Sequence, residues 1–542
     1  MKNYLTNLFA ASAEKLIYLK DVDISFSVPK SESHGDLSTN VAMLLTKQLK
    51  KNPRQIAEEI IKSLELDTNV ITNVEIAGPG FINFHFSSEY VSQIIDNILT
   101  ENEKFGKSDK YKGKTANVEF VSANPTGPLT IGHGRNAVLG DALATLLEYV
   151  GYDVEREYYF NNAGRQMRVL GDSVKLRYLE MLGETIEFPD DYYQGEYIKD
   201  IASSVIEEYG EKVKSEDAEG VFKQAAEQAI FTDIKNTLSR LGIIMKNFFN
   251  EHTLYTDKKI DGVLAAFKEK GLSYENEDAV WLKLTDMGNE QDKVIVKSTG
   301  EPTYRLPDIA YHINKFERNY DLIVDLFGSD HAATYPDVMA GCRALGYDTD
   351  KVKVMIHQFV TIMENGEIVK MSTRKANFVT IDELIDEVGA DVVRYFFVMR
   401  NMNTHLNFEL DLAKKQSDEN PVFYLQYAHA RIASILRMTE QENLKSSTEF
   451  LNLLIHPSEQ RLIKKLHQFA EEILYAAENF EPNKVANYLE ELAAIFHKFY
   501  TDCRILGSDK TLAEARIALA KAAQIVLRNG LTLLKVSTPE RM

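Results

Sequence analysis

The spacing of hydrophobic positions divides the chain into three stretches of different character. Residues 1–108 mix helical spacing with alternating, strand-like runs. From 109 to 410, short apolar runs alternate with helical patterns, the order typical of a parallel sheet with right-handed crossovers. From 411 to 542, apolar residues recur at helical spacing only. The pattern predicts an α+β N-terminal domain, a Rossmann-like α/β domain and an all-α C-terminal bundle of four or five helices.

Local departures from these patterns predict further features. Helical patterns rich in Glu and Lys interrupt the strand–helix alternation between about 185 and 300, which predicts a helical insertion between two halves of the sheet. Residues 25–30 and 74–86 alternate like strands, and the Gly-Pro-Gly break at 78–80 predicts a kink or bulge in the second. Residues 102–114 are polar, lysine-rich and without periodicity, as expected of a linker.

One turn in the central stretch has the residues needed to hold phosphate. A short apolar run ends at Val121, a Pro/Gly-rich turn follows over 124–128, and Gly132 opens a long helical pattern. A strand, a glycine turn and a helix N-terminus direct N–H groups and the positive end of the helix dipole at an anion. His133 lies in the first turn of that helix and can add another donor. A surface histidine that caps a turn would give the same local pattern.

A second polar segment follows a buried strand. Residues 322–327 form a continuous apolar run, as expected for a central parallel strand. Gly328, Ser329, Asp330 and His331 come directly after it, at the strand end where open α/β sheets bind ligands. Asp330 can accept hydrogen bonds from ribose hydroxyls, and His331 can bond a base or a substrate. The alternative is an N-cap aspartate beside a solvated histidine.

Tyr304 and Asp308 form a candidate site for a planar cation. A carboxylate in a crevice binds a guanidinium through two charge-assisted hydrogen bonds, and a neighbouring ring can stack on the same group. Pro307 indicates that no helix interior precedes Asp308. Taken alone, a tyrosine and an aspartate at this spacing are more often structural.

A basic loop is the last candidate element. Asn365-Gly366 lies between two alternating runs and predicts a hairpin turn, and a lysine- and arginine-rich loop follows at 370–375. Mobile basic loops beside a nucleotide site neutralise charge on a leaving pyrophosphate. A cationic surface loop without a catalytic role is the alternative.

Composition limits the classes of function. The net charge of −19 and the pI near 5.2 argue against a protein that coats nucleic acid nonspecifically, although local basic patches can bind a structured RNA. Cys342 and Cys503 lack metal-ligand spacing and fit a reducing compartment. The sequence contains no apolar run of membrane-span length and no secretory signal pattern. We therefore expect a cytoplasmic protein with no membrane association.

Taken together, these segments resemble the class I aminoacyl-tRNA synthetases. Residues 130–133 stand where that class has its His-x-Gly-His signature, and residues 370–372 match the start of its Lys-Met-Ser-Lys-Ser signature, roughly 240 residues later. Several short sequence motifs resemble the arginine-specific family. They include the residues around Glu119 and Asn124, the YxxxDIAY motif at 304–311, and five further phrases. Those phrases are HGD at 34–36, GPGFIN at 78–83, FNNAGRQM at 160–167, YLQYAHAR at 424–431 and the terminal ERM.

The resemblance implies ATP-dependent ligation of L-arginine to the 3′-terminal adenosine of its tRNA, through arginyl-adenylate, with Mg²⁺ assisting. It implies a tRNA-elbow-binding domain (1–108), a catalytic domain (109–410) and an anticodon-binding domain (411–542), and we expect a monomer. The residues matching the family's motifs fall into four sets: Thr130, His133, Lys370 and Ser372 for catalysis; Gly132, His133, Gly328, Asp330, Lys370 and Met371 for ATP; Glu119, Asn124, Tyr304, Asp308 and His331 for arginine; and Phe81, Asn83, Tyr424, Tyr427, Arg431 and Met542 for tRNA.

The chain departs from the family's pattern at two positions. Thr130 replaces the first signature histidine, and Thr373 replaces the second lysine of the basic loop. Some arginyl enzymes carry a compensating lysine before the first signature, but Gly127 stands there. These departures leave a rival interpretation, a non-catalytic tRNA-binding relative that kept the fold. The presence of His133 and Asp308 favours an active enzyme.

Overall fold

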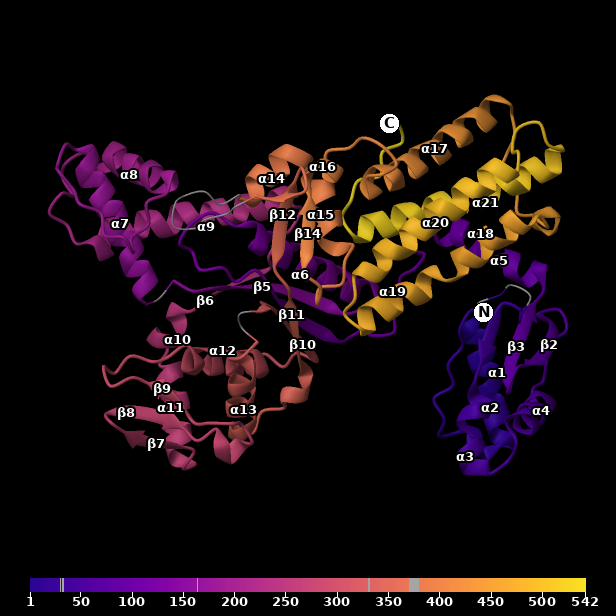
Figure 1. Ribbon diagram of the computed structural model, residues 1–542, viewed down its shortest axis with the longest axis horizontal. Helices are drawn as coiled ribbons and strands as arrows, with labels where there is room; N and C mark the ends of the chain where they lie inside the picture. The colour runs from indigo at the N-terminus through magenta and orange to yellow at the C-terminus, as the bar shows by residue number, and fades with distance from the viewer. Residues whose placement is uncertain (30, 32–33, 163, 330–331, 370–379) are drawn as a thin grey trace.

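The computed structural model describes residues 1–542 except 30, 32–33, 163, 330–331 and 370–379. Figure 1 shows an N-terminal α+β unit, a central sheet that carries two lobes, and a long helical bundle that connects them. The N-terminal unit lies beside the bundle and away from the two lobes (Figure 1). This arrangement agrees with the three predicted classes of domain.

The N-terminal unit is a three-stranded antiparallel sheet covered by helices. The predicted single strand over 74–86 is wrong, because the chain reverses at the Gly-Pro-Gly break, where Gly78 has φ +52° and Gly80 φ +142°. The predicted strand over 25–30 is also wrong, since Ser27 makes only an isolated bridge to Ser38. The elements, with sheet order β1-β3-β2, are α1 (Lys2–Lys15), β1 (Leu37–Thr39), α2 (Val41–Leu44), α3 (Thr46–Leu49), α4 (Pro53–Ser63), β2 (Ile71–Ala77) and β3 (Phe81–Phe86).

The central sheet is parallel throughout, as the strand–helix alternation predicts, and its order is β11-β10-β4-β5-β6. Helix α6 (Ile131–Tyr149) follows β4 and is buried along most of its length because it packs between the sheet and the C-terminal helices. The strands are β4 (Thr115–Glu119), β5 (Asp153–Phe160), β6 (Asn247–Asn250), β10 (Leu322–Gly328) and β11 (Val352–His357).

The predicted continuous insertion over 185–300 is wrong in its extent. Strand β6 lies inside that range and pairs with β5 in the main sheet, so two lobes flank it. The first lobe is helical, and the second adds a small antiparallel sheet, β7-β8-β9 (Figure 1). Their elements are α7 (Arg165–Met181), α8 (Glu196–Tyr209) and α9 (Lys223–Arg240), then α10 (His252–Thr256), α11 (Lys259–Glu269), β7 (Ser273–Asn276), β8 (Ala279–Leu282), β9 (Lys293–Val296), α12 (Arg305–Glu317) and α13 (Tyr335–Leu345).

The predicted hairpin at Asn365-Gly366 is confirmed, because β12 pairs antiparallel with β13 across a turn in which both residues have positive φ. The predicted C-terminal bundle is confirmed as well, with α17–α21 packed on one another. The remaining elements are α5 (Ser88–Glu101), β12 (Val360–Glu364), β13 (Glu367–Ile368), α14 (Ile381–Val388), α15 (Ala390–Val398), β14 (Leu406–Glu409), α16 (Leu410–Ala413), α17 (Pro421–Gln441), α18 (Pro457–His467), α19 (Phe469–Glu478), α20 (Asn483–Asp502) and α21 (Lys510–Leu533).

Helix α5 joins the N-terminal unit to the bundle. It follows β3 directly but packs on α18 and α21 of the bundle. The His467 Nε2 lies 2.8 Å from the Val91 carbonyl oxygen. Of the helices in the described part of the chain, none is long and apolar enough to cross a membrane.

One buried amide ties α6 to the strands on either side of the cleft. The Asn136 Oδ1 accepts a hydrogen bond from the Val121 N–H at 2.6 Å, and its Nδ2 donates to the Leu326 carbonyl at 3.0 Å. Asn136 is 5% exposed, so neither backbone group can turn to water instead. The start of α6 is therefore held between the ends of β4 and β10.

We expect Asn136→Ala to lower the free energy of unfolding by about 2–4 kcal/mol, because it leaves two buried backbone groups without partners. Urea denaturation followed by circular dichroism measures this change. The exposed Asn73→Ala is the control and should stay within about 0.5 kcal/mol of the parent chain. Equal effects of the two substitutions would contradict the role given to Asn136.

Candidate active site

The turn that opens the site is fixed by a reciprocal cap between Thr130 and His133. The Thr130 N–H donates to His133 Nδ1 at 3.2 Å, and the His133 N–H donates to Thr130 Oγ1 at 3.5 Å. The helix therefore begins at Ile131, with His133 in its first turn as predicted. Because Nδ1 accepts, we infer a neutral ring whose proton is on Nε2. The Thr130 hydroxyl oxygen accepts in this cap and also lies 3.3 Å from His133 Nδ1.

Backbone strain marks the point where β4 enters this turn. Val121 has φ +69°, which is unusual for a β-branched residue, and the Ser122 N–H donates to the Phe120 carbonyl at 3.0 Å to close a γ-turn. The Ser122 Oγ accepts a bond from the Tyr159 N–H at 3.1 Å and donates to Glu119 Oε1 at 2.9 Å. Strain of this kind persists only where surrounding bonds impose it, and it is concentrated at functional sites.

The Pro/Gly turn beyond it is held by the helical lobe. The Tyr197 hydroxyl of α8 donates to the Thr126 carbonyl at 2.6 Å. A Cβ added at Gly127 would lie 3.1 Å from the Tyr197 ring and hydroxyl, so the tyrosine occupies the space that a side chain would need. Asn124, a predicted arginine contact, is exposed at the start of this turn.

Below the turn, three carboxylates form a row across the sheet. Asp325 of β10 is the register partner of Glu119 of β4, which is the register partner of Glu157 of β5. Their residues are 0%, 3% and 0% exposed. Burial of three charges side by side is unfavourable unless cations meet them.

Helix α12 and its C-cap residue Arg318 supply those cations. Lys315 donates to both Glu119 and Asp325, and Arg318 donates to Glu157 at 2.8 Å. His312 lies 2.8 Å from the Asp308 carbonyl through Nδ1 and 3.0 Å from the Asp325 carboxylate through Nε2. Both partners are acceptors only, so both ring nitrogens donate and the imidazole is protonated.

The titration of these groups follows from the pairing. Burial opposes the charge on Asp325, yet Lys315 and His312 hold the pKa of that carboxyl below its usual range. Burial likewise opposes charge on His312, but Asp325 raises its pKa. For Glu157, the bonds from Arg318 outweigh burial and lower the pKa. Asp325 and Glu157 therefore stay ionised beside the cations that pair with them.

The N-terminal end of α12 carries the predicted guanidinium site. Tyr304 precedes the first helical residue and is 73% exposed, while Asp308 lies partly buried in the first turn. The expectation from Pro307 is confirmed, because the proline also lies in that first turn. Asp308 and Lys315 are seven residues apart, so they lie on the same face of α12, with Asp308 nearer its N-terminus.

A second acidic residue, Glu251, faces this site and is absent from the sequence prediction. It follows β6 and is 6% exposed. Burial, and next the charge of Asp308, raise the pKa of Glu251 to about 7. Burial and the charges of Glu251, Asp308 and Glu119 also raise the pKa of Tyr159, so these groups lie close enough to interact. The signal was an acidic residue at the carboxyl end of a sheet strand. It was missed because the sequence analysis treated 185–300, which contains β6, as an insertion outside the sheet.

The flanks of the basic loop lie against the first signature. The Ile381 N–H donates to the Leu129 carbonyl at 3.0 Å, and Thr380 forms an isolated bridge with Thr130. Gly328 ends β10 beside His357 of β11. The other predicted ATP, arginine and catalytic residues lie outside the described residues: Asp330, His331, Lys370, Met371 and Ser372.

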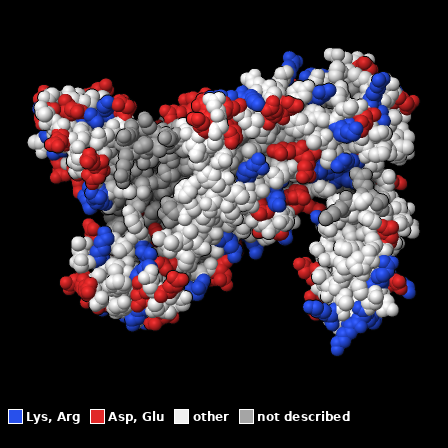
Figure 2. Space-filling view, in the orientation of Figure 1, with Lys and Arg blue, Asp and Glu red and all other residues white. Residues whose placement is uncertain are grey.

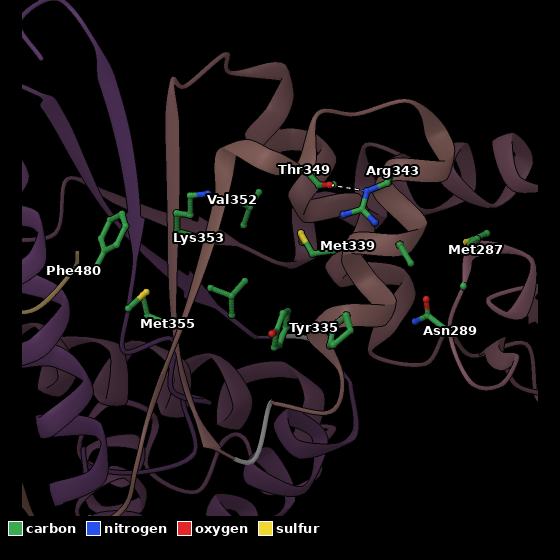
Figure 3. A pocket seen from close by; sticks show the side chains of 14 residues that line it. Met287, Asn289, Tyr335, Met339, Arg343, Thr349, Val352, Lys353, Met355 and Phe480 are labelled. Carbon is green, nitrogen blue, oxygen red and sulfur yellow. Dashed lines mark hydrogen bonds between the residues drawn. The ribbon is translucent and has the colours of Figure 1, made fainter. Parts of the chain in front are cut away.

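A cavity of about 560 Å³ lies beside this site and not in it. Figure 3 shows Tyr335, Met339 and Arg343 of α13 facing β11, with Phe480 on the other side of that strand. Among the residues that the structure describes, its lining contains none of the predicted arginine or ATP contacts. The predicted phosphate and guanidinium sites lie instead at the N-termini of α6 and α12.

The N-terminal unit offers only part of the predicted tRNA surface. Phe81 is 39% exposed, as its predicted role requires. The expected exposed amide of Asn83 is wrong, because the residue is buried and bonds Ser38 at 2.6 Å and Glu75 at 3.2 Å. Figure 2 shows Lys and Arg at the tip of this unit, where the exposed cations are Lys47, Lys50, Lys51 and Arg54.

The predicted anticodon residues form one aromatic and cationic cluster on the bundle. Tyr427 is 40% exposed, and the Arg431 guanidinium donates to its hydroxyl at 3.0 Å. The same guanidinium lies 4.7 Å from the Tyr500 ring centroid, and Tyr424 packs on His497 at 5.2 Å. Met542 is 54% exposed in a C-terminal segment that folds back on α17 through His429 and Arg437.

Comparison with known proteins agrees with this division of the chain. The family model "tRNA synthetases class I (R), catalytic domain" matches residues 94–409, "Arginyl tRNA synthetase N terminal domain" matches 3–86, and "DALR anticodon binding domain" matches 425–542. The Rossmann-like sheet, its cleft and the catalytic-domain match define a class I aminoacyl-tRNA synthetase.

Individual relatives are more specific. The chain is 50% identical over 518 residues to an arginine–tRNA ligase from Desulfotalea psychrophila, covering 95% of this chain and 94% of that one. It is 48% identical to the arginine–tRNA ligase of Salinibacter ruber, with both chains covered completely. The chain therefore belongs to the arginyl-tRNA synthetase family.

Solved structures give the same result for the fold. A putative arginyl-tRNA synthetase from Campylobacter jejuni superposes with a TM-score of 0.78 at 32% identity, covering 84% of this chain and all of that one. The Thermus thermophilus arginyl-tRNA synthetase superposes with a TM-score of 0.80 at 21% identity over both complete chains.

The pKa of Glu251 near 7 predicts that arginine binds more tightly as pH rises. A guanidinium needs the ionised carboxylate, and protonation at lower pH removes it, so affinity should fall about tenfold from pH 8 to pH 6. Isothermal titration calorimetry with arginine, in buffers of different ionisation enthalpy, should also show proton release near pH 7. Glu251→Gln should abolish the dependence. An affinity that is constant over this range would contradict the assignment.

Proposed function

We propose that the cleft between α6 and α12 joins L-arginine to the 3′-terminal adenosine of its tRNA, using ATP and passing through arginyl-adenylate. The observation that carries this proposal is the pairing of two unlike sites in one cleft. A capped helix N-terminus with His133 suits phosphate. A pocket with Asp308 and Glu251 suits a cation.

At the phosphate end, the N-terminus of α6 and Nε2 of His133 would donate hydrogen bonds to ATP. Lys370 and Ser372 are proposed to act with them from the basic loop, whose flank lies beside Thr130. ATP is proposed to enter as its Mg²⁺ complex, the metal belonging to the substrate and reducing charge on its phosphates. Gly328 and Asp330 are proposed to hold the ribose end at the edge of β10.

At the amino-acid end, Asp308 and Glu251 would bind the guanidinium from two sides, and Tyr304 would stack on its plane. Glu119 and Asn124, on the opposite wall, would bind the α-ammonium and carboxylate end. This placement leaves the arginine carboxylate toward His133 and the phosphates.

The chemistry needs no covalent enzyme intermediate. An oxygen of the arginine carboxylate attacks the α-phosphorus, the bond to the pyrophosphate oxygen breaks, and arginyl-adenylate forms. The 2′-hydroxyl of the tRNA adenosine then attacks the arginyl carbonyl carbon and AMP leaves. The protein contributes by placing the reactants and by stabilising charge on the phosphates.

The tRNA would extend from the cleft along the bundle to the N-terminal unit. Tyr424, Tyr427 and Arg431 are proposed to stack on and bond unpaired bases, with Met542 beside them. Phe81 and the basic tip of the N-terminal unit are proposed to contact the elbow. A cytoplasmic, monomeric enzyme is proposed from the sequence alone.

A second candidate function, a non-catalytic tRNA-binding relative, is favoured only by Thr130 in place of the signature histidine. Its hydroxyl is shorter and carries no charge. Charging of tRNA with radiolabelled arginine by the purified protein separates the two functions. Charging supports the enzyme, and tRNA binding without charging or ATP–pyrophosphate exchange supports the relative.

Asp308→Asn should raise KM for arginine on the order of 100-fold, because it removes the charge from a bidentate contact worth about 3 kcal/mol. Aminoacylation assays at saturating ATP and tRNA measure this change, and KM for ATP should stay within about twofold. Asp337→Asn, on α13 and paired with Arg305, is the control. Equal increases in both KM values would contradict the guanidinium assignment.

Tyr427→Ala should raise KM for tRNA about tenfold, because it removes a stacking surface worth about 1–3 kcal/mol. The KM values for arginine and ATP should not change. Tyr274→Ala removes an exposed tyrosine from β7 and is the matched control. If both substitutions leave KM for tRNA unchanged, this face of α17 does not contact the anticodon.

A further inference from the structure

The buried face of α12 carries a continuous stripe of polar side chains. Asp308, His312 and Lys315 follow one another at helical spacing, and the stripe faces the central sheet. The upper end of the stripe is the proposed guanidinium site. The lower end meets the row of carboxylates. The same helix therefore connects the substrate pocket to the buried charges beneath it.

Lys315 holds the central place in this stripe. Its side chain is 0% exposed, and its ammonium donates to Oε2 of Glu119 and, at 2.6 Å, to Oδ1 of Asp325. The ammonium also lies 4.4 Å from the Tyr311 ring centroid. An ammonium has three donors, so the two carboxylates and the ring face account for its surroundings. One side chain thus joins α12 to both strands at the cleft.

The contact with Glu119 bears directly on the substrate site. The Lys315 ammonium donates a hydrogen bond to Oε2 of Glu119, and the Ser122 hydroxyl donates one to Oε1. A carboxylate offers about four acceptor positions, so these two bonds do not use all of them. The carboxylate plane is meanwhile fixed by two bonds from opposite ends. Asp308 lies seven residues before Lys315, about 10 Å along the same helix.

We propose that Lys315 is a positioning residue for arginine recognition. It fixes the register of α12 against β4, so that Asp308 and Tyr304 on one wall stand at a set distance from Glu119 on the other. It touches neither arginine nor ATP. This inference rests on the proposed function, in which Glu119 and Asp308 contact arginine.

Three variants test the inference. Lys315→Met should raise KM for arginine at least tenfold while KM for ATP stays within twofold. Lys315→Arg should recover most of that loss, because a guanidinium can bond both carboxylates. Lys315→Met combined with Asp325→Asn removes one buried carboxylate with the cation. It should regain thermal stability over Lys315→Met but keep the high KM for arginine, because the tether to Glu119 is still missing.

Arg394→Met is the matched control, since Arg394 is a buried cation bound to Asp141 at 2.8 Å outside the cleft. It should lower the melting temperature without raising KM for arginine selectively. The inference is overturned if folded Lys315→Met keeps its KM for arginine. It is also overturned if KM for arginine and ATP rise together, or if the double variant recovers both stability and KM.

The proposed function is tested separately by charging with the parent protein and by Glu119→Gln. Absence of charging would refute the function whatever the Lys315 variants do. If the parent charges tRNA but Glu119→Gln leaves KM for arginine unchanged, the contact assigned to Glu119 is wrong. The inference about Lys315 is then overturned as well. A raised KM in both Glu119→Gln and Lys315→Met supports the inference.

Discussion

The structure depends on the charges buried between α12 and the central sheet. Asp325, Glu119 and Glu157 are neighbours on three strands, and α12 together with its C-cap residue Arg318 brings cations to them. A shift of the helix by one turn would leave buried charges without partners, which is among the most unfavourable changes a protein interior can undergo. Apolar packing alone tolerates more variation. The row therefore sets the register of α12 more narrowly than a hydrophobic contact would.

The two ends of α12 differ in electrostatic balance. Along the row, carboxylates and cations are equal in number. At the N-terminal end, Asp308 and Glu251 repel each other, and burial together with this repulsion raises the pKa of Glu251 to about 7. A cation that enters between them relieves the repulsion, and a neutral amino acid does not. Under the proposed function, selectivity for arginine arises from these two acidic side chains, which the row below holds in place.

The sequence predicted the layers of the fold because period-2 and period-3.6 patterns report burial directly. It predicted His133 and Asp308 because short motifs carry them. Glu251 and the row of carboxylates were not predictable in the same way. In the sequence, Lys315 and Arg318 have the pattern of ordinary surface cations on an amphipathic helix. Only the strand register shows that they face carboxylates. The hairpin at 78–80 was missed because a Gly-Pro-Gly break is compatible with both a bulge and a reversal.

Gly127 shows how the helical lobe limits the chemistry available at the phosphate end. Tyr197 bonds the Thr126 carbonyl and lies close beside Gly127, so a side chain at this position would press against the tyrosine ring. The turn is therefore held by a neutral contact from α8 and gains no cation upstream of α6. Positive charge for a leaving pyrophosphate must then come from later in the chain. Lys370, Arg374 and Lys375 are the candidates in sequence, and Thr380, a few residues after them, forms a bridge with Thr130.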